Sequence, residues 1–313
     1  MNNVSNNPNV DTVGFVGLGT MGRHMASRLL VAGYDINAYD TDSEALQSIA
    51  ERGAHAAGSL AEVAERADIV LLSLPSPEAV ETVVAGQDGI LSGLRAGGLV
   101  VDLSTIDPAT ATRLHDLVEG AGSGFLDAPV SGGPMKAEDG TLTVMIGGEM
   151  EGFRRCEAVL AHLGSNVIHV GPPGSGQMTK LCHNLLVAVI VTGIAESFAT
   201  GVKAGLDVRT LRDVVSSSVA GNWLLDNWFP DTAFADDYDA RFTIDLLRKD
   251  VSLFMKAAAD QDVPVPVSSS AAQVIQTARS RGLGHLDMTS VVKLYEELAG
   301  VRLLENGPTS YIV

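Results

Sequence analysis

A glycine-rich turn near the start of the chain constrains the fold more than any other feature. The apolar run Thr12–Gly17 is typical of a strand, and the turn Gly17-Leu18-Gly19-Thr20-Met21-Gly22 follows it directly, before a helical pattern. In such a unit Gly17 permits a tight turn, Gly19 lets the backbone approach a pyrophosphate, and Gly22 permits close packing of the helix on the strand. The turn therefore predicts a dinucleotide site in a Rossmann-type domain.

A carboxylate some twenty residues after the glycines indicates which dinucleotide binds. Asp40 stands at the end of the second expected strand, Asp35–Tyr39, where it can accept hydrogen bonds from the adenosine ribose hydroxyls. A 2′-phosphate would meet its negative charge, and the next residue is Thr41 rather than an arginine. The sequence therefore favours NAD over NADP. The alternative is that Asp40 only caps the turn into Thr41-Asp42-Ser43.

Short apolar runs alternate with helical patterns from Thr12 to about Gly171, which predicts a doubly wound α/β domain. Several runs are apolar throughout, as expected for strands buried on both faces of a parallel sheet. Two helix starts are marked by a capping residue followed by proline, at Ser76-Pro77 and Asp107-Pro108. The expected strands are Thr12–Gly17, Asp35–Tyr39, Ile69–Leu74, Leu99–Leu103, Gly124–Asp127, Thr141–Ile146 and Asn166–Val170.

The pattern changes after Pro172-Pro173-Gly174. Residues 175–204 lack proline and predict one long helix, which is apolar around much of its circumference and so expected to be buried on several sides. Further helices, without strand candidates, are expected at Val208–Val219, Phe242–Asp260, Ser268–Gly282 and Met288–Ala299. We therefore expect an NAD-binding domain at residues 11–173, a long interdomain helix at 174–204 and an all-helical C-terminal domain at 205–313.

Composition excludes several classes of partner. A net charge of -17 argues against nucleic acid and anionic membranes, because binding to phosphate groups needs clustered lysine and arginine. The most apolar stretch, Leu181–Ala195, is shorter than the roughly 20 residues of a membrane span, which predicts a buried helix. Two cysteines without a CxxC pair, and a polar first ten residues without signal-peptide features, indicate a cytoplasmic protein. No cluster has metal-ligand spacing.

Six motifs in the same order and spacing make the chain resemble the β-hydroxyacid dehydrogenases from about Val13 to Leu298. The motifs are GFVGLGTMG (14–22), LSLP (72–75), DLSTIDP (102–108), DAPVSGGPMKAEDGTLTVMIGG (127–148), GSGQMTKLCHN (174–184) and RKD (248–250). This family includes 3-hydroxyisobutyrate dehydrogenase, tartronate semialdehyde reductase and, more distantly, 6-phosphogluconate dehydrogenase. The resemblance implies hydride transfer between NAD and a small β-hydroxy acid, catalysed by a homodimer or homotetramer.

A lysine one turn into the long helix is the expected catalytic group. Oxidising an alcohol requires a base for the hydroxyl proton, and a lysine can serve if partial burial and the cationic nicotinamide lower its pKa toward neutrality. A lone lysine in a helix is usually a solvated residue, but the apolar setting and the motif favour catalysis here. The resemblance places the catalytic lysine at Lys180 and the substrate-orienting asparagine at Asn184, four residues further along the same helix face.

The resemblance also assigns the remaining substrate and cofactor contacts. Two glycines after a serine expose backbone N–H groups that suit a carboxylate, so the substrate acid group is assigned to Ser131, Gly132 and Gly133. Lys249 matches a family lysine that reaches toward cofactor and substrate. Ser104 and Thr105, just past the strand Leu99–Leu103, are assigned to the nicotinamide end of the cofactor, and Pro75 to the loop that passes over the dinucleotide. The expected cofactor-binding residues are Gly17, Gly19, Thr20, Met21, Gly22, Asp40, Leu74, Pro75, Ser104, Thr105 and Lys249.

Several alternatives stay open. Many hydroxyisobutyrate-type members have two asparagines where this chain has His183 and Asn184, so His183 is interpreted either as a substrate contact or as a helix-packing residue. An NADPH-preferring reductase of a small aldehyde acid, such as tartronate or succinic semialdehyde, is the second candidate function. A non-catalytic NAD-binding module is the third, disfavoured by the presence of Lys180, Asn184 and Lys249. The side chain of the substrate acid is not determined by the sequence.

Overall fold

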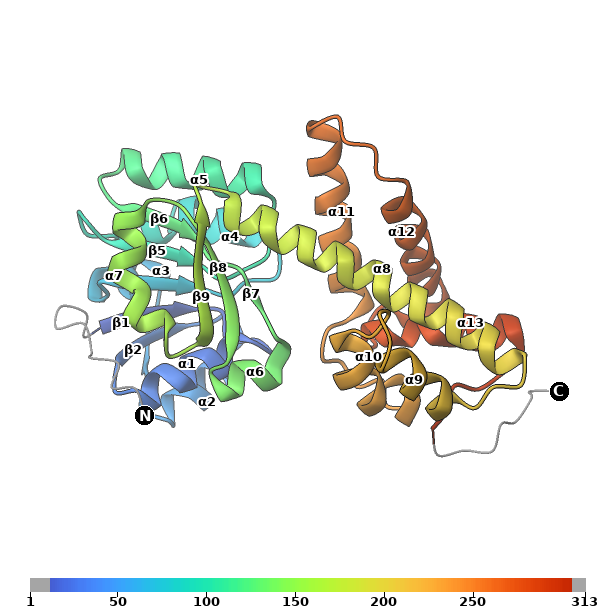
Figure 1. The fold of residues 1–313 in the computed structure, drawn as a ribbon. Helices are drawn as coiled ribbons and strands as arrows, with labels where there is room; N and C mark the ends of the chain where they lie inside the picture. Colours follow the sequence, from blue (N-terminus) through green and yellow to red (C-terminus); the bar gives the residue numbers. More distant parts are fainter. Residues whose placement is uncertain (1–11, 306–313) are drawn as a thin grey trace. The chain divides into compact units, whose positions relative to one another are not determined.

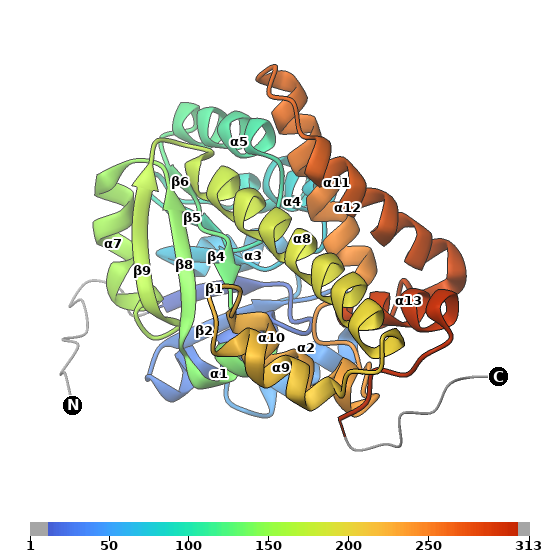
Figure 2. The same cartoon turned by 45° about the vertical axis from the view of Figure 1, so that its right-hand side comes forward.

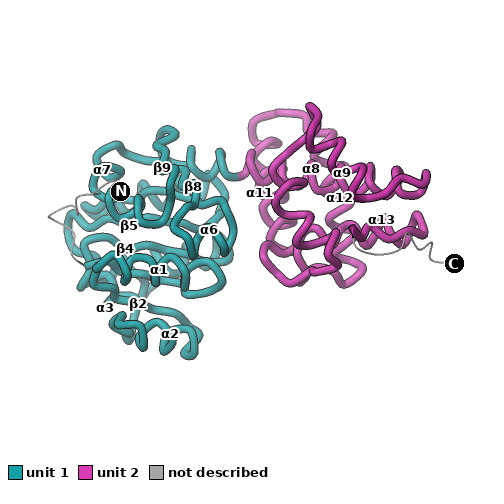
Figure 3. Tube along the Cα trace, turned by 60° about the horizontal axis from the view of Figure 1, so that its bottom comes forward, with its two compact units in different colours: residues 1–180 teal, residues 181–313 magenta. Residues whose placement is uncertain are grey.

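The computed structural model describes residues 12–305. The chain forms two compact units, one up to Lys180 and one from Leu181 onward (Figure 3). The division falls inside the helix that the sequence analysis treats as a connection between domains, so the domain boundaries at 173 and 204 stay a prediction. The polar first ten residues lie outside the described residues. The expected fold class, a Rossmann-type domain followed by a helical one, is confirmed.

Six strands of the first unit form a parallel sheet (Figure 1). They are β1 (Thr12–Val16), β2 (Asp35–Tyr39), β3 (His55–Ala56), β4 (Ile69–Leu72), β5 (Leu99–Asp102) and β6 (Gly124–Asp127). Their order across the sheet is β3-β2-β1-β4-β5-β6, so the direction of winding reverses between β1 and β4. Ligands of doubly wound sheets bind at the carboxyl ends of the strands beside such a reversal. The glycine-rich turn follows β1 and Leu74 follows β4, so both lie at this point.

The central strands are buried on both faces, as their apolar runs predict. In β4, Ile69 and Leu71 belong to the core beneath α1 (Gly22–Val31), while Val70 and Leu72 belong to the core on the opposite face. That second core includes residues of α3 (Leu60–Arg66), α4 (Pro77–Ala85) and α5 (Pro108–Gly120). The helix starts expected at the two proline pairs are confirmed, since Ser76 caps α4 and Asp107 caps α5.

The sheet is not parallel throughout, in contrast to the parallel sheet expected from the sequence, because two of its last three strands run in the opposite direction (Figure 2). The strands are β7 (Val130–Ser131), β8 (Leu142–Gly147) and β9 (Gly164–Gly171), with α6 (Gly133–Asp139) and α7 (Met150–Leu160) between them. Strand β8 pairs antiparallel with both β6 and β7, and β9 runs parallel to β8. The reason is that β7 continues the direction of β6 after two residues, so the chain turns back through α6 and β8 returns alongside both.

Helices make up the second unit. They are the part of α8 (Ser175–Lys203) from Leu181, then α9 (Val208–Ser216), α10 (Trp223–Asn227), α11 (Ile244–Asp260), α12 (Pro266–Ala278) and α13 (Val292–Ala299), with short 3₁₀ and π turns. Between residues 181 and 305 no strand is formed, as expected, apart from a single bridge between Thr243 and Asp287. Phe198 of α8 stacks on Phe234, which also contacts Phe229, within the hydrophobic core of this unit.

Helix α8 has the expected length but is less buried than expected. By length and composition it could cross a membrane, because an 18-residue apolar window within it has a mean hydropathy of 2.0, so the length argument based on Leu181–Ala195 is wrong. In the protein, 44% of that apolar window is buried, and Ala188 and Val191 pack into the core of the second unit. Leu186 is 60% exposed, so burial on several sides is not found within one chain.

Candidate active site

The glycine-rich loop between β1 and α1 has the geometry predicted for each of its glycines. Gly17 has a φ of +94°, and a Cβ there would lie 2.2 Å from the carbonyl oxygen of Ser73. A Cβ at Gly22 would lie 1.9 Å from the carbonyl oxygen of Gly17, so α1 packs directly on the loop. No atom lies within 4 Å of a Cβ built at Gly19. The first and last glycines are therefore required for packing, whereas the middle one keeps its backbone open to a ligand.

The start of α1 differs from the helix starts that follow it. No side chain caps α1, and its first turn carries no acidic residue. The next four helices, of which α2 spans Ser43–Ala50, are capped by Asp42, Ser59, Ser76 and Asp107. Uncapped N–H groups at the positive end of a helix bind phosphate. This arrangement fits a dinucleotide pyrophosphate at the residues Thr20 and Met21, as the sequence predicts.

Asp40 holds the glycine-rich loop in place. Its Oδ2 accepts a hydrogen bond of 2.5 Å from the Leu18 N–H, and its Oδ1 accepts one of 2.8 Å from the Asp42 N–H. The second bond is the turn cap that the sequence analysis considered as an alternative. The carboxylate is only half-buried, and each oxygen has a further lone pair. Capping and ribose binding are therefore compatible at Asp40.

The loops after β4 and β5 are joined to each other by Ser104. The Leu74 N–H donates to the Ser104 Oγ over 2.9 Å, and the Ser104 N–H donates to Asp102 Oδ1 over 2.9 Å. Ser104 is buried, whereas Thr105 is half-buried. The structure thus brings together the expected cofactor residues Leu74, Pro75, Ser104 and Thr105, and the Ser104 hydroxyl also has a structural task.

The serine and glycines assigned to the substrate acid form a turn whose backbone conformation favours glycine. Gly132 has a φ of +140° and Gly133 a φ of +73°, both in the region that L side chains rarely adopt. Ser131 is the last residue of β7 and pairs with Thr143 of β8, while Gly133 begins α6. All three residues of the turn are half-buried. The segment is therefore a strand end followed by a helix start.

Lys180 lies in α8, where it is 7% exposed. The buried carboxylate of Asp127, which the sequence analysis did not select as a site residue, fixes the start of this helix. Asp127 accepts hydrogen bonds of 2.8 Å from the Gly174 N–H on Oδ1 and from the Gln177 N–H on Oδ2. Burial raises the pKa of the Asp127 carboxyl above its usual value, and these N–H donors oppose that shift. The sequence offered one signal for this role, because Asp127 stands at the end of an expected strand and begins the motif that contains Ser131.

A second polar cluster lies in the second unit around Asp250, which the sequence analysis did not select. Asp250 is 2% exposed, and its Oδ2 accepts a hydrogen bond of 2.5 Å from Asn184 Nδ2. The Lys249 Nζ lies 2.9 Å from Asp250 Oδ1. Asn184 and Lys249, both expected to bind substrate, are thus brought together by this carboxylate. Its position on the buried face of α11, three residues after Leu247, is a signal visible in the sequence.

His183 is on the exposed side of α8. Its ring Nδ1 lies 2.9 Å from Asn184 Oδ1, so the imidazole and the carboxylate of Asp250 hold the Asn184 amide from both ends. The His183 ring is not part of the hydrophobic core of the second unit, and its role toward the substrate stays a prediction.

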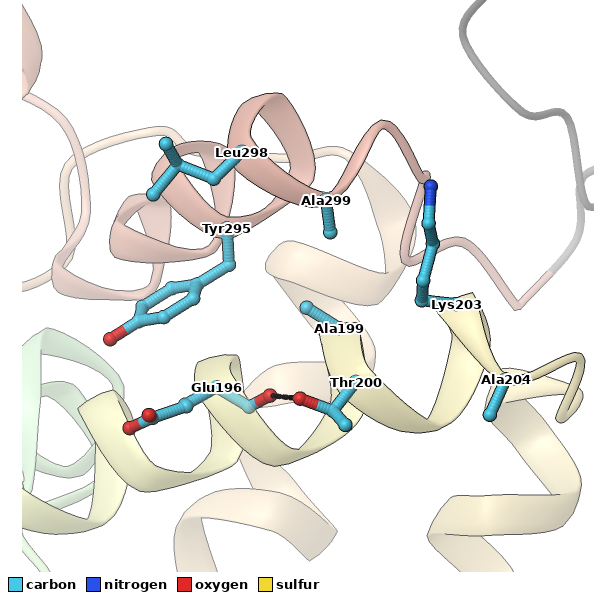
Figure 4. Close-up of a pocket in the computed structure, with 8 residues that line it drawn as sticks. All are labelled: Glu196, Ala199, Thr200, Lys203, Ala204, Tyr295, Leu298 and Ala299. Atoms are coloured by element: carbon cyan, nitrogen blue, oxygen red, sulfur yellow. Dashed lines mark hydrogen bonds between the residues drawn. The ribbon is translucent and has the colours of Figure 1, made fainter.

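Two open cavities lie away from these residues. A groove of about 400 Å³ between α8 and α13 is lined by Glu196, Ala199, Thr200, Lys203, Ala204, Tyr295, Leu298 and Ala299 (Figure 4). The other, of about 480 Å³, lies at the amino ends of the parallel strands and is lined by Thr12, Asp35, Asn37, His55, Arg66 and Arg95. Neither contains an expected site residue. Within residues 12–305 no group of three His, Cys, Asp or Glu side chains could hold a metal ion.

Comparisons with known proteins agree with this geometry. Residues 12–171 match the NAD binding domain of 6-phosphogluconate dehydrogenase, and residues 174–295 match the NAD-binding domain of NADP-dependent 3-hydroxyisobutyrate dehydrogenase. Among curated relatives, 2-(hydroxymethyl)glutarate dehydrogenase of Eubacterium barkeri is 35% identical, with 92% of this chain and 96% of that one covered. 3-Hydroxyisobutyrate dehydrogenase of Pseudomonas aeruginosa is 36% identical, with 90% and 98% covered.

A solved structure gives the same result for the fold. 3-Hydroxyisobutyrate dehydrogenase of Mycobacterium tuberculosis, solved with L-serine, has a TM-score of 0.83 and 32% identity, with 91% of this chain and 99% of that one covered. Family models, relatives and this structure cover nearly the whole chain. The chain belongs to the β-hydroxyacid dehydrogenase family of NAD(P)-dependent oxidoreductases.

Proposed function

We propose that this enzyme oxidises the hydroxyl of a small β-hydroxy acid with NAD, or catalyses the reverse reduction, with Lys180 as the acid–base group. The observation that carries the proposal is the position of Lys180. It is a buried lysine in the first turns of a helix whose start is hydrogen-bonded to Asp127 and to the loop after β5, at the carboxyl edge of a dinucleotide-binding sheet. A buried lysine at such an edge is unusual for a structural residue, because Lys is rarely fully buried.

The chemistry divides between cofactor and protein. NAD, held by the glycine-rich loop and Asp40, would supply the hydride acceptor. The unprotonated Lys180 Nζ would accept the proton of the substrate hydroxyl during oxidation, and the protonated amine would return it to the carbonyl oxygen in the reverse direction. Backbone N–H groups of Ser131, Gly132 and Gly133 bind the acid group, while Asn184 and Lys249 orient the substrate. The carboxylate of Asp250 keeps the last two side chains ordered.

We propose NAD rather than NADP because of Asp40. In Asp40→Asn the charge that opposes a 2′-phosphate is removed, and one amide oxygen remains as an acceptor for the loop. We expect the ratio of kcat/KM for NADP to that for NAD to rise by about 10- to 100-fold, since juxtaposed like charges cost several kcal/mol. Steady-state kinetics with both cofactors measure it. Asp42→Asn is the matched control, because it loses the same charge two residues away and should leave the ratio unchanged. A wild-type preference for NADP would contradict the proposal.

A panel of substrates tests the reaction itself. 3-Hydroxyisobutyrate, L-serine, glycerate, threonate and a sulfonated three-carbon analogue are offered with NAD at alkaline pH, and formation of NADH is followed by absorbance. We expect at least one acid with the hydroxyl on the β carbon to react, and simple alcohols without an acid group to fail. Activity only with NADPH and an aldehyde acid, such as succinic semialdehyde, would establish the second candidate function instead.

We further propose that the enzyme is a cytoplasmic homodimer or homotetramer. Exposed apolar residues of α8 such as Leu186 support self-association, since a second copy would cover them. Two unpaired cysteines, buried Cys156 and exposed Cys182, suit a reducing compartment.

A further inference from the structure

Gln177, in the first turn of α8, has a fully buried side chain that binds one loop through both ends of its amide. Its Oε1 accepts a hydrogen bond of 3.0 Å from the Ile106 N–H, and its Nε2 donates one of 2.9 Å to the Ser104 carbonyl. The two contacts pair a single side chain with the backbone of residues 104–106, as a neighbouring strand would. The helix start and this loop are therefore held at a fixed distance.

The loop and the helix that this amide joins each contain residues assigned to one part of the proposed reaction. The loop contains Ser104 and Thr105, assigned to the nicotinamide end of the cofactor. The helix carries Lys180 three residues after Gln177, which is about 4.5 Å further along the axis and nearly on the same face. Gln177 is thus the side chain that connects the nicotinamide loop directly with the turn preceding the acid–base lysine.

Other contacts fix the backbone of the helix start and the backbone of the loop separately. Asp127 binds the N–H groups of Gly174 and Gln177 from the side of β6. A Cβ at Gly176 would lie 2.4 Å from the Met145 carbonyl oxygen, so the first turn also lies tightly against β8. The loop, in turn, is held to β4 by the bond between the Leu74 N–H and the Ser104 Oγ. Removing the Gln177 amide would leave these anchors in place and remove the two hydrogen bonds that join the helix start to the loop.

We propose that Gln177 is a positioning residue that sets the place of Lys180 relative to the nicotinamide loop. The inference rests on the proposed function, because it assumes that hydride transfer at this loop and proton transfer at Lys180 occur on one substrate. Gln177→Leu removes both hydrogen bonds at similar volume. We expect kcat to fall by about 10- to 100-fold, since a misplacement of about 1 Å has this effect. The Kd for NAD should stay within about threefold, because the glycine-rich loop is unchanged.

Gln177→Glu gives a readout that a merely structural role would not produce. A protonated carboxyl can donate to the Ser104 carbonyl and accept from the Ile106 N–H, and so replaces the amide. The ionised form cannot donate, and burial beside a carbonyl raises the pKa of the new carboxyl. The kcat of the variant should therefore be rescued at low pH and be lost as pH rises through that pKa, relative to the wild type. Calorimetry with NAD and steady-state kinetics across pH measure both effects on the full chain.

Thr192→Val is the matched control. It removes a buried hydroxyl that bonds to the Ala188 carbonyl in the same helix, and its kcat should stay within about twofold of the wild type. Wild-type kcat in Gln177→Leu, or a pH profile of Gln177→Glu parallel to that of the wild type, overturns the inference. If Gln177→Leu does not fold, the pH profile of Gln177→Glu decides. An active wild type with inactive Lys180 variants and an unaffected Gln177→Leu refutes this inference alone, whereas an inactive wild type refutes the proposed function with it.

Discussion

Replacing Lys180 by methionine is expected to lower kcat for hydroxy-acid oxidation by about 10²- to 10⁴-fold, the usual contribution of a positioned acid–base group. Methionine keeps most of the side-chain volume at this buried position, so packing of α8 should be conserved. The variant lacks an atom that can accept the hydroxyl proton. The Kd for NAD should change by less than about threefold, because the cofactor contacts in the glycine-rich loop and at Asp40 are intact.

Steady-state kinetics and calorimetric titration with NAD separate these two effects. Lys203→Met is the matched control, because Lys203 is an exposed lysine at the other end of the same helix and should be silent. Lys180→Ala adds a second measurement, since a small primary amine in solution should restore part of its activity. Retention of more than a tenth of kcat in Lys180→Met would contradict the assignment.

Valine at Gly19 is expected to abolish dinucleotide binding without unfolding the protein. Nothing lies within 4 Å of a Cβ at this position, so the fold should accept the side chain, which would occupy the space beside the backbone that a pyrophosphate needs. We expect the Kd for NAD to rise by at least about 100-fold, as anion binding at a helix start requires direct approach to the N–H groups. The midpoint of thermal unfolding without ligand should stay within a few degrees of the wild type.

Alanine at Gly22, in contrast, is expected to lower the stability of the fold itself. Its Cβ would meet the Gly17 carbonyl oxygen at 1.9 Å, so α1 must move away from the loop. Overpacking of this kind costs about 1–3 kcal/mol or more of unfolding free energy, and the unfolding midpoint should fall clearly. Gly120→Val, with open space at its Cβ, is the control for the side chain itself.

Thermal unfolding with and without NAD distinguishes the three variants, because a bound ligand stabilises the folded state. The wild type and Gly120→Val should show the stabilisation, and Gly19→Val should not. If Gly19→Val were stabilised by NAD as much as the wild type, the cofactor would lie elsewhere.

The local patterns of the sequence are sufficient for most of the fold. The apolar run Ile69–Leu72 predicts a strand buried on both faces, and the pair Asp107-Pro108 predicts a helix start, because both depend on neighbouring residues. The reversal of β8 could not be predicted in this way. Whether a strand runs parallel or antiparallel depends on which strand it meets, and β7, only two residues long, gives no periodic signal.

In the candidate site, too, local sequence patterns predict some features and miss those that depend on distant residues. The conformation of Gly17 could be predicted because the motif itself requires it. The partners of Gln177 could not, since Ser104 and Ile106 are more than seventy residues earlier in the chain. Buried polar side chains such as Asp250 are satisfied by such distant groups, and no local spacing records them. Local sequence patterns therefore do not reveal which distant residues support a site residue.

The position of the dinucleotide loop at the reversal of winding also has a consequence for how the protein folds. Val13 of β1 pairs with Ile69 of β4, although β2, β3 and three helices lie between them in the chain. Closing so long a loop is slow, because its entropy is lost before the pairing is gained. The loop and its neighbour Leu74 face each other only after this closure. During refolding, the first moment at which NAD can bind therefore reports the joining of the two halves of the sheet.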